Sequence, residues 1–111
     1  MKTNVRRNAR VYCGMPARAV ATTGTIRGVV RNLSCGGMFF LTPGAFRVGQ
    51  TVDMLLDLPG KQPTKATGEV RYQYKYTDGQ GVGVKFVRLG ADDLATIAEY
   101  VNRRTGPISN S

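Results

Sequence analysis

Two short polar clusters contain the side chains of this 111-residue chain that are best suited to bind a ligand. The first is Arg6-Arg7-Asn8-Ala9-Arg10, in which Arg6 and Arg10 are four residues apart. In an extended segment their guanidinium groups project to the same side, roughly 13 Å apart at about 3.3 Å per residue. Because a guanidinium group binds phosphates and base edges through paired donors, two of them at this spacing can hold two ends of one ligand.

The second cluster is Asn32-Leu33-Ser34-Cys35-Gly36-Gly37. Asn32 and Ser34 share one strand face by the period of two, so an amide and a hydroxyl stand directly before a glycine turn. The glycines permit a positive φ and a tight reversal, and they let a ligand approach the backbone. The alternative is that Asn32 and Ser34 only cap the turn through hydrogen bonds to the backbone.

The charge of the chain favours an anionic partner. Sixteen Lys and Arg against seven Asp and Glu give a formal net charge of +9, and residues 1–52 contain no carboxylate side chain. Such a field attracts nucleic acid, a phosphorylated small molecule or an anionic membrane face. A basic surface that serves only solubility is the alternative to a binding site.

The residue types that are missing argue against an enzyme and against a metal protein. The chain has no histidine, which is the usual general base near neutral pH and the commonest metal ligand. Cys13 and Cys35 lie too far apart for a CxxC pair and are too few for a zinc site, so we expect free, reduced thiols. No apolar run approaches the roughly 20 residues of a membrane span, and we expect a cytoplasmic protein without a cofactor.

Short alternating stretches separated by glycine predict a small all-β domain around these clusters. Strands are expected within residues 11–22, 25–33 and 37–41, with Pro16 marking an edge or a bulge. Residues 52–58 alternate as a half-buried strand that ends at Pro59-Gly60. Residues 70–76 and 82–86 should pair as a hairpin across Asp78-Gly79.

Only the end of the chain changes to a helical period. Four apolar residues recur at helical spacing, acidic residues precede them, basic residues follow them, and Gly106-Pro107 should stop the helix. The four residues are Leu94, Ile97, Ala98 and Val101. About six antiparallel strands and one terminal helix favour a small barrel, with the helix either capping an opening or packing on an outer face.

The aromatic residues outside the two clusters have two interpretations. Tyr72, Tyr74 and Tyr76 share a face of one strand and would suit either a stacking platform for single-stranded nucleic acid or the core and its rim. We favour the core and rim, because aromatic residues on one strand face are more often packed inside. Four further residues are assigned to the core: Met38, Phe40, Phe46 and Phe86.

With both motifs in order at this spacing, the sequence resembles the PilZ domain family. Arg6-Arg7-Asn8-Ala9-Arg10 matches the RxxxR motif, and Asn32-Leu33-Ser34-Cys35-Gly36-Gly37 matches the [D/N]xSxxG motif about twenty residues later. A last strand reading GVGVKF leads to a helix, as in the family, and the likeness runs from about Val5 to Arg104. The resemblance implies a small six-stranded antiparallel β-barrel with one C-terminal α-helix.

The resemblance also implies a function. Family members act in bacteria as non-enzymatic receptors for cyclic di-GMP, so a separate effector protein is expected to receive the signal. The residues carried over as ligand-binding are Arg6, Arg7, Arg10, Asn32, Ser34 and Gly37. The alternative function is a basic β-barrel that binds nucleic acid, which explains the charge but not the second motif.

The same likeness divides the chain into three segments. Residues 1–9 are expected to form a mobile N-terminal arm that carries the start of the arginine motif. Residues 10–105 should form the PilZ-like barrel with its helix, and residues 106–111 a flexible tail.

Overall fold

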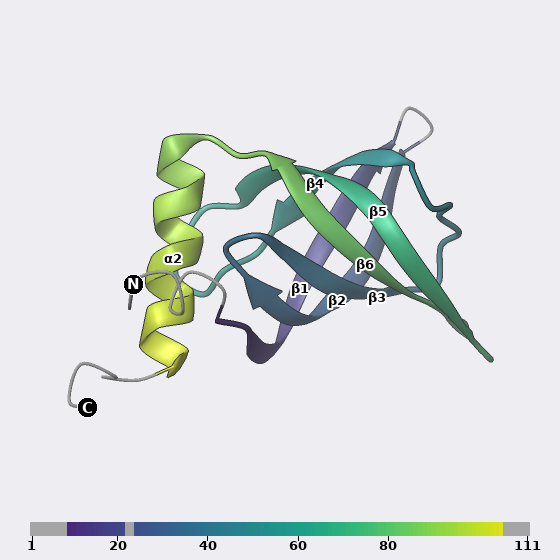
Figure 1. Cartoon of the computed structure of the whole chain (residues 1–111), viewed down its shortest axis with the longest axis horizontal. Coiled ribbons are helices and arrows are strands. Elements are labelled where there is room, and N and C mark those ends of the chain that lie inside the picture. The colour runs from purple at the N-terminus through teal and green to yellow at the C-terminus, as the bar shows by residue number, and fades with distance from the viewer. Residues whose placement is uncertain (1–8, 22–23, 106–111) are drawn as a thin grey trace.

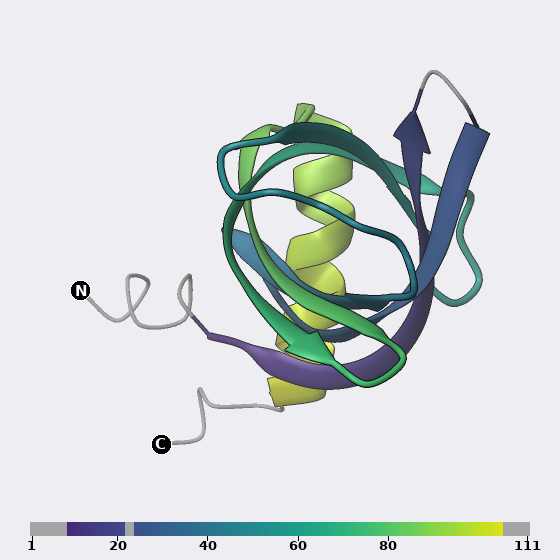
Figure 2. The ribbon, with the colours of Figure 1, turned by 90° about the vertical axis from the view of Figure 1, so that its right-hand side faces the viewer.

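The computed structural model describes residues 9–21 and 24–105 of the chain. Six antiparallel strands close into a barrel in the order β1-β2-β3-β6-β5-β4, and one helix lies across an end of it (Figures 1 and 2). The elements are β1 (Val11–Ala21), β2 (Gly24–Ser34), β3 (Gly37–Thr42), β4 (Thr51–Leu56), β5 (Thr64–Tyr76), β6 (Gly79–Arg88) and α2 (Ala91–Thr105). The predicted all-β barrel with a C-terminal helix is confirmed, and the helix caps an opening.

The alternation of apolar and polar residues decides which face of each strand points into the barrel. In β4, Val52, Met54 and Leu56 are buried, while Asp53 faces outward and accepts a hydrogen bond from Thr67 of β5 (2.9 Å). The predicted core residues Met38, Phe40 and Phe46 are buried, and Phe86 packs against the core from its margin. The predicted hairpin between β5 and β6 is also present, with Tyr76 opposite Gly79.

Irregular strand pairing places some residues where a strict period of two does not. The register of β5 against β6 shifts between Val70 and Tyr72, so that Arg71 is an extra residue. Val70 therefore points into the core while Tyr72, Tyr74 and Tyr76 are exposed on the outside. The assignment of these tyrosines to the core and rim was wrong, because a bulge changes which residues share a face.

The start of β1 also contains an irregularity, as Pro16 suggested. The register of β1 against β2 shifts between Tyr12 and Met15, directly before the proline. The carbonyl of Pro16 accepts a hydrogen bond from the amide of Asp57 (3.0 Å), so the residue joins the barrel through its oxygen alone.

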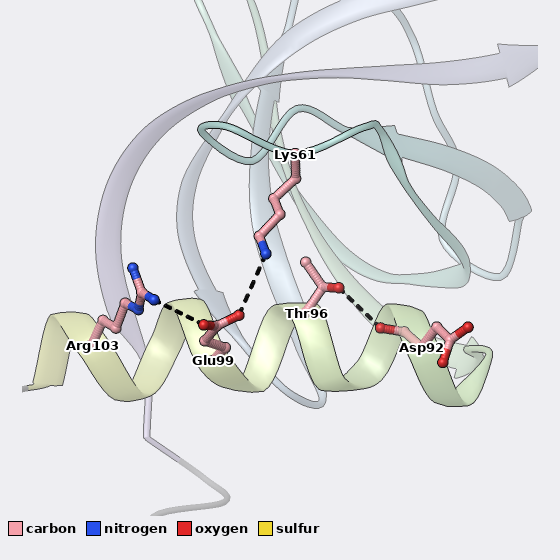
Figure 3. Close-up of polar contacts among 5 residues, drawn as sticks. All are labelled: Lys61, Asp92, Thr96, Glu99 and Arg103. Carbon is pink, nitrogen blue, oxygen red and sulfur yellow. Dashed lines mark hydrogen bonds and ion pairs between the residues drawn. The ribbon is translucent and has the colours of Figure 1, made fainter.

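The helix α2 seals the barrel with fewer apolar residues than the periodicity indicated. Ile97 and Val101 are fully buried against the barrel end, whereas Leu94 stays exposed. The outer face is polar. Figure 3 shows Glu99 pairing with Arg103 (2.9 Å) and Lys61 (3.6 Å), and the Thr96 hydroxyl donating to the Asp92 carbonyl (3.0 Å). A capping helix needs only the narrow stripe that faces the opening, which explains why Leu94 is left outside.

Candidate ligand-binding site

Arg10, the last residue of the first polar cluster, meets the second cluster at the point where β1 begins. Arg10 directly precedes β1, and the pairing of β1 with β2 sets Val11 opposite Leu33 and Tyr12 opposite Asn32. The Arg10 guanidinium consequently donates a hydrogen bond to the Asn32 side-chain oxygen (3.4 Å), although the residues are 22 positions apart. Arg6 and Arg7, the other predicted arginines, lie outside the described residues, as does the proposed N-terminal arm except for Ala9.

A cleft opens beside this contact. Its volume is about 340 Å³, and its lining combines three cations from different parts of the chain with the ring of Tyr72 and the turn between β2 and β3. The cations are Arg10 before β1, Arg71 of β5 and Lys85 of β6. Three positive charges around a small cleft favour an anionic ligand, and an aromatic ring at its wall suits a planar group.

Ser34 lies at this cleft, but its hydroxyl also holds the turn together. It donates to the Gly37 carbonyl (3.3 Å) and accepts from the Gly36 amide (3.2 Å), and the residue is only 6% exposed. A hydroxyl has one proton and two lone pairs, so one acceptor position remains for a ligand. The turn-capping alternative therefore describes a real contact, and it leaves Ser34 able to accept one further hydrogen bond.

Gly37 is required by the packing of two strands. A Cβ at this position would collide with the carbonyl oxygen of Val84 in β6, so β3 and β6 approach closely only because residue 37 is glycine. Neither Gly36 nor Gly37 has a positive φ, whereas Gly24, Gly49, Gly60 and Gly79 do. The turn between β2 and β3 is the tight reversal that was expected, and it forms without the positive φ that its glycines permit.

The polar groups around the cleft leave it positively charged. Arg71 forms an exposed ion pair with Glu69 (3.8 Å), which neutralises part of one cation. Arg104 of α2 donates to the carbonyl of Tyr12 (3.1 Å). Because Tyr12 is two residues after Arg10, this contact brings a fourth cation close to Arg10. Exposed ion pairs contribute about 0–1 kcal/mol, so the Glu69 carboxylate is not a strong competitor for an anion.

The two cysteines are free, as expected, and neither is a candidate nucleophile. Burial raises the pKa of the Cys35 thiol, which lies in the turn beside the cleft. Burial also raises the pKa of Cys13, although hydrogen bonds from Met15 and Tyr100 and the charge of Arg104 oppose that shift. Both thiols are therefore protonated at neutral pH, where the thiolate would be the reactive form.

Arg71, Tyr72 and Lys85 line the cleft without having been singled out as site residues in the sequence. Of these, only Tyr72 carried a signal, because it belongs to the run of tyrosines in β5.

In residues 9–21 and 24–105, no three His, Cys, Asp or Glu side chains are grouped to hold a metal ion. Among these described residues, no helix has both the length and the apolar character needed to cross a membrane.

Comparisons with known proteins bear on the family and the fold of this chain. The model of the PilZ domain family matches residues 4–103, which is most of the chain. Among curated proteins, none matches the sequence significantly.

Solved structures share the fold at low sequence identity. The inhibitor of motility MotI/DgrA of Bacillus subtilis is 17% identical, with a TM-score of 0.77 over 86% of this chain and 49% of its own, so this chain spans about half the length of that protein. The PilZ domain of YcgR from Escherichia coli, solved with c-di-GMP, is 10% identical, with a TM-score of 0.72 over 87% of this chain and 88% of that domain.

Proposed function

Because this chain belongs to the PilZ domain family, we propose that it is a receptor that binds cyclic di-GMP and signals to a partner protein. The observation that carries the proposal is the contact between Arg10 and Asn32 at the edge of the cationic cleft. It joins one residue of each motif, although the two residues are 22 positions apart. The E. coli relative solved with c-di-GMP supports the choice of ligand.

The chemistry of the side chains suits both halves of the ligand. Guanine presents O6 and N7 as paired acceptors that a guanidinium fork fits, and a guanidinium plane can also stack on a purine. In this proposal Arg6 and Arg10 engage guanine and phosphate, Arg7 assists, and Asn32 and Ser34 contact a base. Gly37 keeps the turn free of a side chain beside that base.

The environments and chemistry of Arg10 and Asn32 support the roles proposed for them. Arg10 is exposed, and its bond to Asn32 is long, so it can turn toward a ligand at little cost. Asn32 is neutral and can both donate and accept, whereas an aspartate would offer a charged acceptor to the guanine N–H groups. The amide therefore lowers affinity for guanine relative to aspartate without changing which base is recognised.

The proposed receptor is not an enzyme. With no histidine in the sequence, binding and release remain as its proposed activity. The signal would pass to an effector protein that recognises the changed surface around Arg10.

Titration calorimetry with cyclic di-GMP tests the proposal. We expect binding in the nanomolar to micromolar range, about 8–12 kcal/mol, without appearance of linear dinucleotide. Cyclic di-AMP is the matched control, because it carries the same two phosphates but lacks guanine O6. Absence of binding heat at about 100 μM protein, equal affinity for the two dinucleotides, or steady hydrolysis would each contradict the proposal.

A further inference from the structure

An aromatic surface covers the outside of the barrel beyond the cleft. It consists of Phe39 of β3 with Tyr72, Tyr74 and Tyr76 of β5, which we call the aromatic face. The three tyrosines are 43%, 58% and 52% exposed. Phe39 stacks beside Tyr72 with centroids 6.2 Å apart and an interplanar angle of 22°, and Tyr74 meets both rings edge to face.

The strand between β3 and β5 explains how these rings lie. β6 runs between them and presents Gly81 and Gly83 on its outer side, with Phe39 and Tyr72 both opposite Gly83. A Cβ at Gly83 would collide with the ring of Tyr72, and one at Gly81 with the ring of Phe39. The rings of Phe39 and Tyr72 therefore lie across bare backbone, and the exposed surface of Tyr72 is available to a planar partner.

Cations border the aromatic face. A groove of about 750 Å³ runs beside it, between β2 and the end of the β5–β6 hairpin, and is lined by Arg31, Lys75 and Tyr76. Arg71 lies at the opposite end, next to Tyr72. Two carboxylates are near: Glu69, which is paired with Arg71, and Asp78 at the turn of the hairpin. The border therefore remains net positive.

We propose that the aromatic face binds single-stranded nucleic acid, with bases stacked on the exposed rings and phosphates held by Arg31, Lys75 and Arg71. Unpaired bases offer planar surfaces to aromatic rings, and their backbone matches a basic border. The bases of a duplex are already stacked on one another, so the rings could not reach them. An acidic protein would satisfy the cations but would leave the ring faces without a planar partner.

This surface extends beyond the proposed cyclic di-GMP site, although Arg71 and Tyr72 line the cleft as well. Tyr74 and Lys75 do not line the cleft that contains Arg10. Substitutions at these two positions therefore test binding at the aromatic face and its border without altering the cleft. Both side chains are exposed, and their substitution removes no core contact.

Fluorescence anisotropy with a labelled oligothymidylate of about fifteen nucleotides tests the proposal, at about 50 mM salt and without cyclic di-GMP. Tyr74→Leu removes the ring and should weaken binding about fivefold or more, since one stacked base is worth at least that much. Tyr74→Phe keeps the ring and should bind like the parent protein. Calorimetry with cyclic di-GMP should give the same affinity for both variants and the parent.

Charge variants complete the test. Lys75→Gln should weaken binding and reduce the salt dependence by about one counterion, whereas Lys61→Gln, beside the helix, should not. No binding of the oligonucleotide would overturn the proposal. So would equal affinity of Tyr74→Leu and the parent, equal affinity for a duplex of the same length, or displacement by polyglutamate as effective as by unlabelled oligonucleotide.

Discussion

At the scale of single residues, a substitution of Arg10 distinguishes whether cyclic di-GMP is recognised by the shape of the guanidinium group or attracted by its charge. Arg10→Lys keeps the net charge at +9 but removes the planar fork, so affinity for cyclic di-GMP should fall about five- to a hundredfold. Each lost bidentate contact corresponds to about 1–3 kcal/mol. Calorimetry at fixed salt measures the effect, and Arg47→Lys, away from the cleft, is the control. A lysine variant that binds as tightly as the parent would show that Arg10 contributes charge alone.

Ser34 has two roles that one substitution separates. Ser34→Ala leaves the Gly36 amide without its acceptor and removes the donor to the Gly37 carbonyl, so stability should fall by about 1 kcal/mol. Binding of cyclic di-GMP should also weaken by about 1 kcal/mol, because the remaining lone pair is lost. Denaturant unfolding and calorimetry report the two effects independently. Unchanged stability would refute the capping role, and unchanged affinity of the folded variant would remove Ser34 from the binding site.

At the scale of elements, α2 offers a matched pair of apolar residues on one helix. Ile97 is 0% exposed in the barrel opening, whereas Leu94 is 42% exposed one turn earlier. Ile97→Ala should destabilise the protein by about 2–5 kcal/mol, since it leaves a cavity that the rigid barrel end cannot close. Leu94→Ala should cost less than about 1 kcal/mol. Equal losses in chemical denaturation would mean that the helix does not seal the barrel through its buried stripe.

The sequence predicted the elements well and their irregularities poorly. Alternation in residues 52–58 identified β4 and its inward face, because no bulge interrupts that strand against β1 or β5. The tyrosines of β5 alternate just as regularly, yet Arg71 forms a bulge that turns them outward. A bulge depends on how the neighbouring strand fits, and nothing in the sequence of β5 alone reports that fit.

The candidate site was predicted only as far as its motifs extend. Arg10 and Asn32 could be named because each lies in a recognisable pattern, and the structure brings them together. Arg71, Tyr72 and Lys85 reach the same cleft from β5 and β6, 34 to 48 residues beyond the end of the second motif. Their convergence needs the closed barrel, in which β3 pairs with β6, and no local pattern indicates that pairing.

At the scale of the whole molecule, the two thiols should make the free energy of unfolding depend on pH in the alkaline range. Burial raises the pKa of Cys13 and Cys35 in the folded protein, whereas an unfolded thiol titrates near pH 9. Their contribution is therefore complete below about pH 9 and is lost as the pH rises toward the folded pKa values. The free energy of unfolding should decline above pH 9, and less steeply in a Cys13→Ala, Cys35→Ala double variant. Parallel profiles for the two proteins would contradict this prediction.

Closure of the barrel also constrains the order in which the chain can fold. β1 pairs with its second neighbour only when β4 is present. β3 pairs with its second neighbour only when β6, the last strand to be synthesised, is present. During synthesis the β1–β2–β3 meander therefore exposes two unpaired edges, which are the sites where strands of different chains can associate. Because these closing pairs join distant parts of the chain, their formation should be slow. The interval between translation of β3 and docking of β6 is thus the period in which the nascent protein is most vulnerable to aggregation.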